Sequence, residues 1–264
     1  MSKTAPAADQ PAASDASAPG PVTLAIDIGG SNLKAGLLGR DGALVGKRVR
    51  VPTMHPSPPD KVVPALVGLA KQLGPFGRVS VGFPGLIKGG LVQTAPNLGT
   101  KDWAGFDLAG ALRKQLGKPV RMLNDATVQG LGVISGQGLE CVITLGTGFG
   151  FALYHDGRLA PQLEMSQHVI RKEMTYDEYV GVEALNKLGQ KHWGRRVERV
   201  LAQLRAVVNF DMLYIGGGDA QKLELKLPKD VKVVSNDAGI TGGVRLWDSK
   251  LDDSFAGRDN ATTE

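Results

Sequence analysis

The chain has 264 residues and carries 31 lysines and arginines against 26 aspartates and glutamates, which gives a formal net charge of +5. This length suffices for two modest domains, and no apolar stretch reaches the roughly 20 residues that cross a bilayer, so we expect a cytoplasmic protein without a membrane partner. A single cysteine, Cys141, and four histidines without metal-ligand spacing exclude a disulfide framework and a structural zinc site.

The first 20 residues are rich in alanine, proline and serine and hold almost no large apolar side chain. Such a segment cannot bury enough surface to offset the entropy of ordering, so residues 1–20 are predicted to be a disordered tail. Three β-rich runs follow, namely Val22 to Ile28, Leu33 to Leu38 and Leu44 to Val51, with Asp41-Gly42 between the last two. This pattern predicts a three-stranded meander.

The turn from Asp27 to Lys34 places a carboxylate at a strand end, followed by two glycines, a hydroxyl and an ammonium group. Its main-chain N–H groups can cradle phosphate oxygens while the acid holds hydrated Mg²⁺, although Gly-Gly between strands is also an ordinary hairpin turn. The G-x-G-x-x-G and G-x-x-x-x-G-K-[ST] patterns are absent, which disfavours a Rossmann or P-loop site.

Helices are predicted over Asp60 to Leu73, Phe106 to Leu116 and Ala126 to Ile134. Asn124-Asp125 precedes the third helix and follows a predicted strand, Val120 to Leu123. Asp125 is therefore either the N-cap of that helix or a carboxylate at a strand end, where a kinase needs a base for the acceptor hydroxyl.

A second meander repeats the plan of the first, with strands Cys141 to Leu145 and Phe149 to Tyr154 around the turn Gly146-Thr147-Gly148, and then the turn Asp156-Gly157. The repetition predicts a duplicated fold whose two glycine turns face each other across a cleft, with chance similarity as the alternative. The Thr147 hydroxyl and the N–H groups of the turn suit a second phosphate contact.

The longest helical pattern runs from Tyr176 to Val208, with a break expected near Gly189 or Gly194. Four arginines lie largely off its apolar face, as a solvated surface or as a track for a polyanion; they are Arg195, Arg196, Arg199 and Arg205.

Two further strands, Met212 to Ile215 and Val231 to Ser235, alternate with helices and imply α/β layers. The glycines Gly216, Gly217 and Gly218 follow the first of these, either as a strand-to-helix turn or as a flat surface for a ligand ring. Residues 249–264 are polar and acidic and are expected to be a flexible tail.

Five motifs occur in an order that resembles the ROK-family sugar kinases of the actin/hexokinase superfamily. They are Asp27-Ile-Gly-Gly-Ser-Asn-Leu-Lys34, Gly82-Phe-Pro-Gly85, Leu123-Asn-Asp-Ala126, Leu145-Gly-Thr-Gly-Phe-Gly150 and Ile215-Gly-Gly-Gly-Asp-Ala220. The likeness spans about Val22 to Trp247. It is nearest to the polyphosphate glucokinases, through Thr94-Ala-Pro-Asn97, Trp103 and Asn236-Asp-Ala-Gly-Ile-Thr-Gly-Gly243.

The resemblance implies an α/β fold with two ribonuclease-H-like domains of the actin-like ATPase kind around a central cleft, over residues 21–122 and 123–248. It implies a homodimeric enzyme that transfers a phosphoryl group from polyphosphate or ATP, with Mg²⁺ and no zinc, to the 6-hydroxyl of glucose.

The resemblance also implies the roles of individual residues. Asp125 would be the general base and Asn124 would hold a neighbouring hydroxyl. Mg²⁺, bound by Asp27 through water, and the transferred group would be handled by Asp27, Gly29, Gly30, Ser31, Asn32 and Lys34. The other phosphates would meet Gly146, Thr147 and Gly148, and an adenine would meet Gly216, Gly217 and Gly218. The remaining sugar contacts would be Asn97, Glu164 and Glu178.

One segment departs from the family pattern, because the E-x-G-H motif is replaced by Glu164-Met-Ser-Gln-His168. Either Gln167 donates in place of the histidine, or a one-residue slip lets His168 serve, or His168 is structural. A non-catalytic sugar-binding or regulatory ROK protein is therefore one alternative, and a kinase for mannose or an N-acetylhexosamine is another. No helix-turn-helix precedes Asp27, so no nucleic-acid partner is expected.

Overall fold

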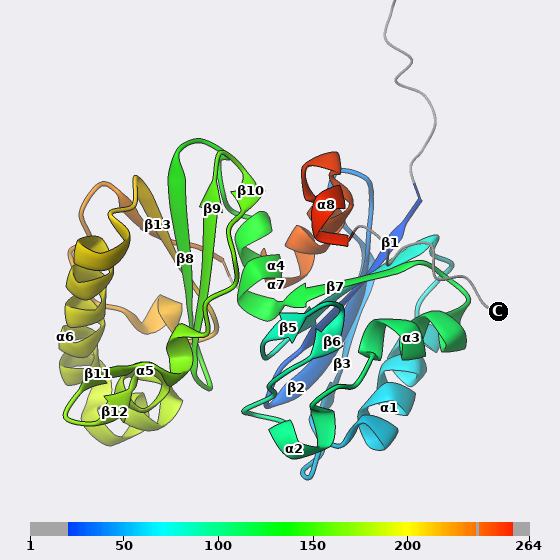
Figure 1. Cartoon of the computed structure of the whole chain (residues 1–264), viewed down its shortest axis with the longest axis horizontal. Coiled ribbons are helices and arrows are strands. Elements are labelled where there is room, and N and C mark those ends of the chain that lie inside the picture. Colours follow the sequence, from blue (N-terminus) through cyan, green and yellow to red (C-terminus); the bar gives the residue numbers. More distant parts are fainter. Residues whose placement is uncertain (1–20, 236–237, 256–264) are drawn as a thin grey trace, which may run out of the picture.

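The computed structural model describes residues 21–235 and 238–255, which fold around two five-stranded sheets (Figure 1). The first sheet has the order β3-β2-β1-β4-β7, with β1 (Thr23–Ile28), β2 (Asn32–Leu38), β3 (Leu44–Pro52), β4 (Arg78–Phe83) and β7 (Val120–Asn124). The second has the order β10-β9-β8-β13-β14, with β8 (Leu139–Leu145), β9 (Phe149–His155), β10 (Arg158–Leu159), β13 (Met212–Gly216) and β14 (Val231–Val233).

The two sheets share one strand plan. In each, three consecutive strands pair antiparallel as a meander, and two later strands add in parallel beside the first strand of that meander. The duplication predicted from the two strand–glycine-turn–strand segments is therefore confirmed. Because β1 and β8 both end in a glycine turn, the same kind of turn stands at the matching edge of each sheet.

Helices cover the outer face of each sheet and fill the space between the sheets (Figure 1). The outer helices of the first sheet are α1 (Pro59–Lys71) and α3 (Leu108–Leu116), and those of the second sheet are α5 (Tyr176–Val180) and α6 (Val182–Val208). Between the sheets lie α4 (Asp125–Leu131), α7 (Ala238–Thr241), η3 (Gly242–Trp247), η4 (Ser249–Leu251) and α8 (Asp252–Phe255). The central layer thus carries Asp125 at the start of α4.

Local sequence explains where the predicted helices begin and end. The helix α1 begins with Pro59 at its first position, where a missing N–H costs nothing. The Asp107 carboxylate accepts the Gly110 N–H at 2.7 Å and caps α3, which Gly117 ends with φ 62°. The long predicted helix is divided at Gly181, and its expected break is confirmed at Gly189, where φ is 71°.

The expectation of a tail from Ser249 is wrong for residues 249–255. These residues form η4 and α8, and Leu251 and Phe255 are buried in the layer between the sheets. The Arg121 guanidinium holds them in place, because it lies 4.7 Å from the Phe255 ring centre and 3.1 Å from the Asp252 carboxylate. The predicted N-terminal tail and residues 256–264 lie outside the described residues.

The C-terminal part of the chain contacts both sheets. Ile240 packs with Ala25 and Leu38 of the first sheet, and the Ser80 hydroxyl donates to the Gly243 carbonyl at 2.6 Å. A domain boundary at residue 123 therefore stays a prediction, because α7 and η3 follow that residue in the chain but pack against the first sheet. Within the described residues, no helix combines the length and apolar content that a membrane crossing needs.

The remaining elements are short and lie in the connections. They are the hairpin of β5 (Ile87–Lys88) and β6 (Leu91–Val92), α2 (Thr100–Trp103), η1 (Met165–Gln167), the hairpin of β11 (Val169–Arg171) and β12 (Met174–Thr175), and η2 (Ala220–Lys222). Of these, η1 and the segment after β12 border the cleft, as described below.

Candidate active site

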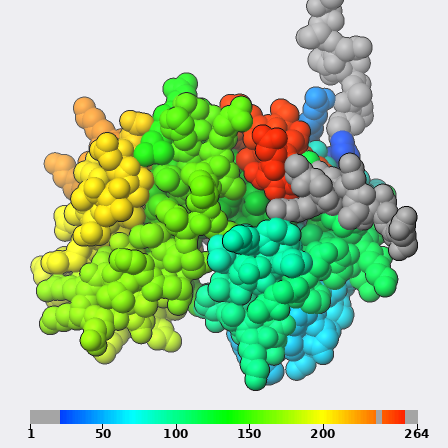
Figure 2. Space-filling model, in the orientation of Figure 1, coloured from blue at the N-terminus to red at the C-terminus, as the bar shows by residue number. Residues whose placement is uncertain are grey.

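A cavity of about 300 Å³ lies where the two halves meet, and both glycine turns line it. Figure 2 shows the halves as two masses that join along the middle of the molecule. Most of the residues predicted from the sequence line this cavity: Asp27, Gly29, Gly30, Ser31, Asn32, Lys34, Asn97, Asn124, Asp125, Gly146, Thr147, Gly148, Glu164, Gly217 and Gly218. Gly216, Gln167, His168 and Glu178 are not among its lining residues.

The first glycine turn is fixed by the segment that follows β3. The Thr53 hydroxyl donates to the Gly29 carbonyl at 2.7 Å, and the His55 ring lies 3.0 Å from the Gly30 carbonyl oxygen. At its base, Lys34 Nζ lies 2.9 Å from Asp27 Oδ2, and both side chains are only partly exposed. The turn therefore offers the cavity main-chain groups together with one cation and one carboxylate.

The second glycine turn is anchored to the helices of the other half. Asp177 Oδ1 accepts the Phe149 N–H at 2.6 Å, and the Gly146 carbonyl accepts the Val182 N–H at 2.8 Å. A Cβ atom at Gly148 would lie 2.5 Å from Asp177 Oδ1, so any other residue there would displace the carboxylate that accepts the Phe149 N–H.

The two turns face each other across the cavity. A Cβ atom at Gly30 would lie 3.1 Å from Asn97 Cβ and 3.6 Å from Thr147 Cγ2, so the first turn comes within contact distance of the second. The opposed turns expected from the sequence are confirmed. A ligand that enters between them meets residues of both turns.

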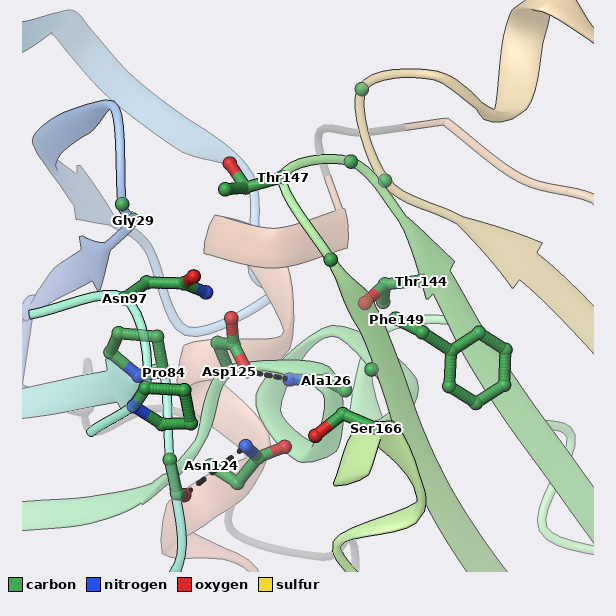
Figure 3. A pocket seen from close by; sticks show the side chains of 18 of the residues that line it. Gly29, Pro84, Asn97, Asn124, Asp125, Ala126, Thr144, Thr147, Phe149 and Ser166 are labelled. Carbon is green, nitrogen blue, oxygen red and sulfur yellow. Dashed lines mark hydrogen bonds between the residues drawn. The ribbon is translucent and has the colours of Figure 1, made fainter. Parts of the chain in front are cut away.

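The sequence left two roles open for Asp125, helix cap and base, and the structure gives the cap to Asn124. Asn124 is the N-cap of α4, because its Oδ1 accepts the Thr127 N–H at 3.2 Å, while its Nδ2 donates to the Gly85 carbonyl at 3.3 Å. Asp125 is the first helical residue, and its Oδ1 accepts the Ala126 N–H at 2.8 Å. Figure 3 shows its carboxylate pointing into the space below Asn97 and Thr147, with Thr144 and Ser166 on the opposite wall.

The surroundings of Asp125 disfavour its charged form. Burial is the main cause that raises its pKa from 3.8 to about 7, and the neighbouring Asp27 and Glu164 carboxylates raise it further, whereas the Ala126 N–H acts in the opposite direction. A carboxylate with a pKa near the working pH can both accept and release a proton, as a general base must.

The wall opposite Asp125 is built by η1 and α5. The buried Ser166 hydroxyl donates to Glu164 Oε1 at 2.5 Å, and Gln167 Nε2 lies 3.1 Å from Ser166 Oγ and 3.4 Å from Asp177 Oδ2. Burial raises the pKa of the Asp177 carboxyl. Ser166 lines the cavity at the place that a glycine holds in the family motif, and Gln167 supports it from behind.

Two residues expected to contact the sugar, Glu178 and His168, do not line the cavity. Glu178 is exposed and forms a capping box with Thr175, whose N–H it accepts at 2.8 Å, while its neighbour Asp177 faces the cavity. His168 is exposed, and its ring centre lies 6.2 Å from that of Tyr176. Asp177 was within reach of sequence reasoning, since Asp177-Glu178 offers two adjacent acids and only the helix geometry decides between them.

Two polar residues of the cavity carried no sequence signal. Thr144 ends β8 and lines the cavity beside the second turn. Gln129 lies one helical turn after Asp125, and its Nε2 is buried with no hydrogen-bond partner within the part of the chain that the structure describes. A buried amide without a partner is costly, which favours an oxygen-rich ligand or water at this end of the cavity.

Comparison with known proteins agrees with this geometry. Residues 23–161 match the model of the ROK family. The polyphosphate glucokinase of Mycobacterium tuberculosis (strain CDC 1551 / Oshkosh) is 32% identical over 233 residues, which cover 82% of this chain and 88% of the relative. That of Mycobacterium leprae (strain TN) is 31% identical, with 82% of this chain and 72% of the relative covered.

Solved structures share the architecture. The inorganic polyphosphate/ATP-glucomannokinase of Arthrobacter sp. strain KM has a TM-score of 0.78 and 30% identity, with 85% of this chain and 97% of that chain covered. A ROK family glucokinase from Streptomyces griseus has the same fold, with a TM-score of 0.67, 18% identity and 85% and 98% of the two chains covered. The expected actin-like ATPase architecture is therefore confirmed.

Proposed function

The chain belongs to the ROK family and is a sugar kinase, and from this premise we propose that it transfers the terminal phosphoryl group of polyphosphate or ATP to the 6-hydroxyl of glucose. The observation that carries the proposal is the position of Asp125. Its carboxylate, with a pKa raised to about 7, points into a cavity that two opposed glycine turns line.

In the proposed reaction, Asp125 accepts the proton of the 6-hydroxyl as the oxygen attacks the terminal phosphorus of the donor. The new O–P bond forms while the bond from that phosphorus to the bridging oxygen breaks, and the shortened donor leaves with the electron pair. Positioning and charge neutralisation supply most of the acceleration, and the base contributes about 10²- to 10⁴-fold.

Mg²⁺ is part of the proposal, and the cavity suits it. This ion usually keeps several waters and binds one or two carboxylates together with phosphate oxygens. Asp27 and Asp125 supply two carboxylates on the cavity wall. Among the described residues, no three His, Cys, Asp or Glu side chains form a group that could hold a metal ion by themselves, so water and the phosphate oxygens of the donor would complete the coordination. Asp27 would hold the ion through water, and when bound the ion would neutralise charge on the transferred group.

The hexose is proposed to lie between Asn97, Asn124 and Asp125 on one side and Glu164 and Asp177 on the other. All five of these residues carry a side-chain carbonyl or carboxylate oxygen and line the same cavity, which suits the hydroxyls of a sugar. Gln167 would act through its contacts with Ser166 Oγ and Asp177 Oδ2 rather than through the sugar itself.

The test is a coupled assay of hexose 6-phosphate formation, with glucose, mannose and N-acetylglucosamine each offered polyphosphate or ATP in the presence of Mg²⁺. We expect glucose to be phosphorylated with at least one donor. Absence of product from every combination would contradict the proposal, and product from the N-acetylhexosamine alone would move it to another substrate.

A non-catalytic sugar-binding role is the second candidate, because neither Gln167 nor His168 lines the cavity where the family motif places a histidine. Tight binding of glucose in calorimetry without turnover on either donor would favour it. A cytoplasmic homodimer completes the proposal, and sedimentation at twice the mass of one chain would support the dimer.

A further inference from the structure

Beyond the proposed base, α4 places a second buried polar side chain in the cavity, that of Gln129. It lies four residues after Asp125, so the two side chains stand on the same face of the helix. Gln129 lines the cavity and is only 4% exposed. It is therefore the next polar side chain of α4, after Asp125, that a ligand in the cavity meets.

The amide of Gln129 is not satisfied by the protein. Its Nε2 is buried and has no hydrogen-bond partner among the described residues. A buried N–H group without an acceptor destabilises the fold, so the acceptor has to come from the cavity, as a ligand or as water. Because no partner fixes the N–H2 group, a half-turn about the last side-chain bond of the glutamine can carry it toward that acceptor.

Packing places this amide in the part of the cavity that the second half builds. A Cβ atom at Gly216 would lie 2.8 Å from Gln129 Cδ and Nε2, so the amide packs directly against the end of β13. Gly216 is the register partner of Thr144, which lines the cavity just before the second glycine turn. The next two glycines, Gly217 and Gly218, line the cavity themselves. Gln129 therefore lies beside the residues for which the sequence predicts phosphate and nucleotide contacts.

The cavity offers an anionic ligand little positive charge. Lys34 is the single cation among its described lining residues, and Lys34 Nζ lies 2.9 Å from Asp27 Oδ2, which shares that charge. The lining also includes the carboxyl groups of Asp125, Glu164 and Asp177. A donor that brings several negative charges into this space depends on Mg²⁺ and on neutral N–H and O–H groups. Hydrogen bonds from such groups to charged oxygens are stronger than those between neutral groups.

We propose that Gln129 is a donor-binding residue, whose amide N–H group donates to an oxygen of the donor phosphate next to the transferred group. This inference rests on the proposed function and deepens it. Residues four apart on a helix have Cβ atoms about 5–6 Å apart, so Asp125 can act at the acceptor hydroxyl while Gln129 holds the leaving phosphate. Polyphosphate and ATP share this phosphate, so the contact serves both donors.

The experiment replaces the amide in two ways. Gln129→Met removes its hydrogen-bonding groups at similar length, and Gln129→Glu keeps the shape but puts an acceptor oxygen in place of the N–H2 group. The control is Gln72→Met at the end of α1, whose amide donates to the Gly68 carbonyl at 3.2 Å on the exposed side. With Mg²⁺ present, each protein is compared in the KM for tripolyphosphate, ATP and glucose and in calorimetric binding of tripolyphosphate, and its Tm is measured without ligand.

We expect Gln129→Met to raise the KM for tripolyphosphate, the KM for ATP and the Kd for tripolyphosphate about tenfold, with the glucose KM changed less than about twofold. Gln129→Glu should raise both donor KM values further, because its carboxylate repels phosphate. The Tm of unliganded Gln129→Met should equal or exceed that of the wild type, because the substitution removes an N–H group that has no acceptor. Gln72→Met should leave all three KM values unchanged.

Three results would overturn this role of Gln129. A lower Tm together with equal rises in the glucose and donor KM values would make the residue structural. Unchanged donor KM and Kd values would mean that only water meets the amide, and a rise confined to ATP would place the amide at the nucleoside. If the wild type binds tripolyphosphate but turns over no donor, and this binding weakens in Gln129→Met, the proposed function fails and the Gln129 contact stands.

Discussion

The two meanders share one strand plan but differ in where they place charge. In the first, the end of β1 brings Asp27 opposite Lys34, and the meander continues into the cationic β3. In the second, Thr144 holds the corresponding place near the end of β8, and its register partner is Gly150. The first half thus presents charged side chains to the cavity at its turn, whereas the second presents the hydroxyl side chains Thr144 and Thr147.

This difference shows how a duplicated fold acquires two separate tasks. The strand plan fixes two opposed turns, and side chains added to each copy decide what the turn can hold. The cations of the first copy suit a polyanionic donor, while Glu164, Ser166 and Asp177, which follow the second meander, suit the hydroxyls of a sugar. Asp125 stands between them at the start of α4.

Removing the carboxylate between the two halves should have the largest effect. We expect Asp125→Asn to lower kcat by about 10²- to 10⁴-fold, because an amide cannot accept the hydroxyl proton, while the hexose Kd changes less than about threefold. Steady-state kinetics and calorimetry measure the two quantities, with Asp60→Asn on the exposed face of α1 as a control for charge. Turnover within tenfold of the wild type would show that Asp125 is only part of the helix start.

Substitutions of acidic residues on the cavity side of the second half should have the next largest effect. We expect Asp177→Asn to raise the hexose KM by about tenfold or more, because a charged acceptor of hydrogen bonds is lost, with little change in the donor KM. Glu178→Ala should instead lower the free energy of unfolding by about 0.5–2 kcal/mol through loss of the capping box and leave the hexose KM nearly unchanged. The reverse pattern would return the sugar contact to Glu178.

The close approach of the two glycine turns can be tested by adding a methyl group to the first of them. A methyl group at Gly30 would lie 3.1 Å from Asn97 Cβ, and overpacking of this kind costs about 1–3 kcal/mol. We therefore expect Gly30→Ala to raise the donor KM by about 5- to 150-fold. Gly68→Ala within α1 has open space around its Cβ and is the control. Equal kinetics for the two variants would mean that the turns do not close on the donor.

The smallest effect concerns stability. Because the folded state raises the pKa of Asp125, this carboxyl stabilises the fold while it is protonated, and that contribution is lost as the pH rises from about 4 through about 7. Asp125→Asn has no such loss, so its Tm should exceed that of the wild type by more at pH 8 than at pH 5, by about 2–4 °C for each kcal/mol. A difference in Tm that shrinks with rising pH would show that Asp125 is not desolvated.

Sequence reasoning found the strand plan and most of the cavity, because glycine turns and β-branched runs are local signals. It named Glu178 and not Asp177 as a sugar contact, because the two acids differ only in the side of α5 that they occupy. It left the cap of α4 as one of two roles for Asp125, whereas the structure has Asn124 as the cap. It also missed the packing of Leu251 and Phe255, since burial of two apolar residues in a polar segment depends on Arg121, more than 120 residues earlier.

The pH dependence of kcat/KM for glucose tests the central claim most directly, because it reports the ionisation of the free enzyme's base. With the pKa of Asp125 raised to about 7, kcat/KM should fall about tenfold for each pH unit below 7 and level off above it. A profile that stays flat from pH 5 to pH 8 would contradict the assignment of Asp125 as the base between the two halves.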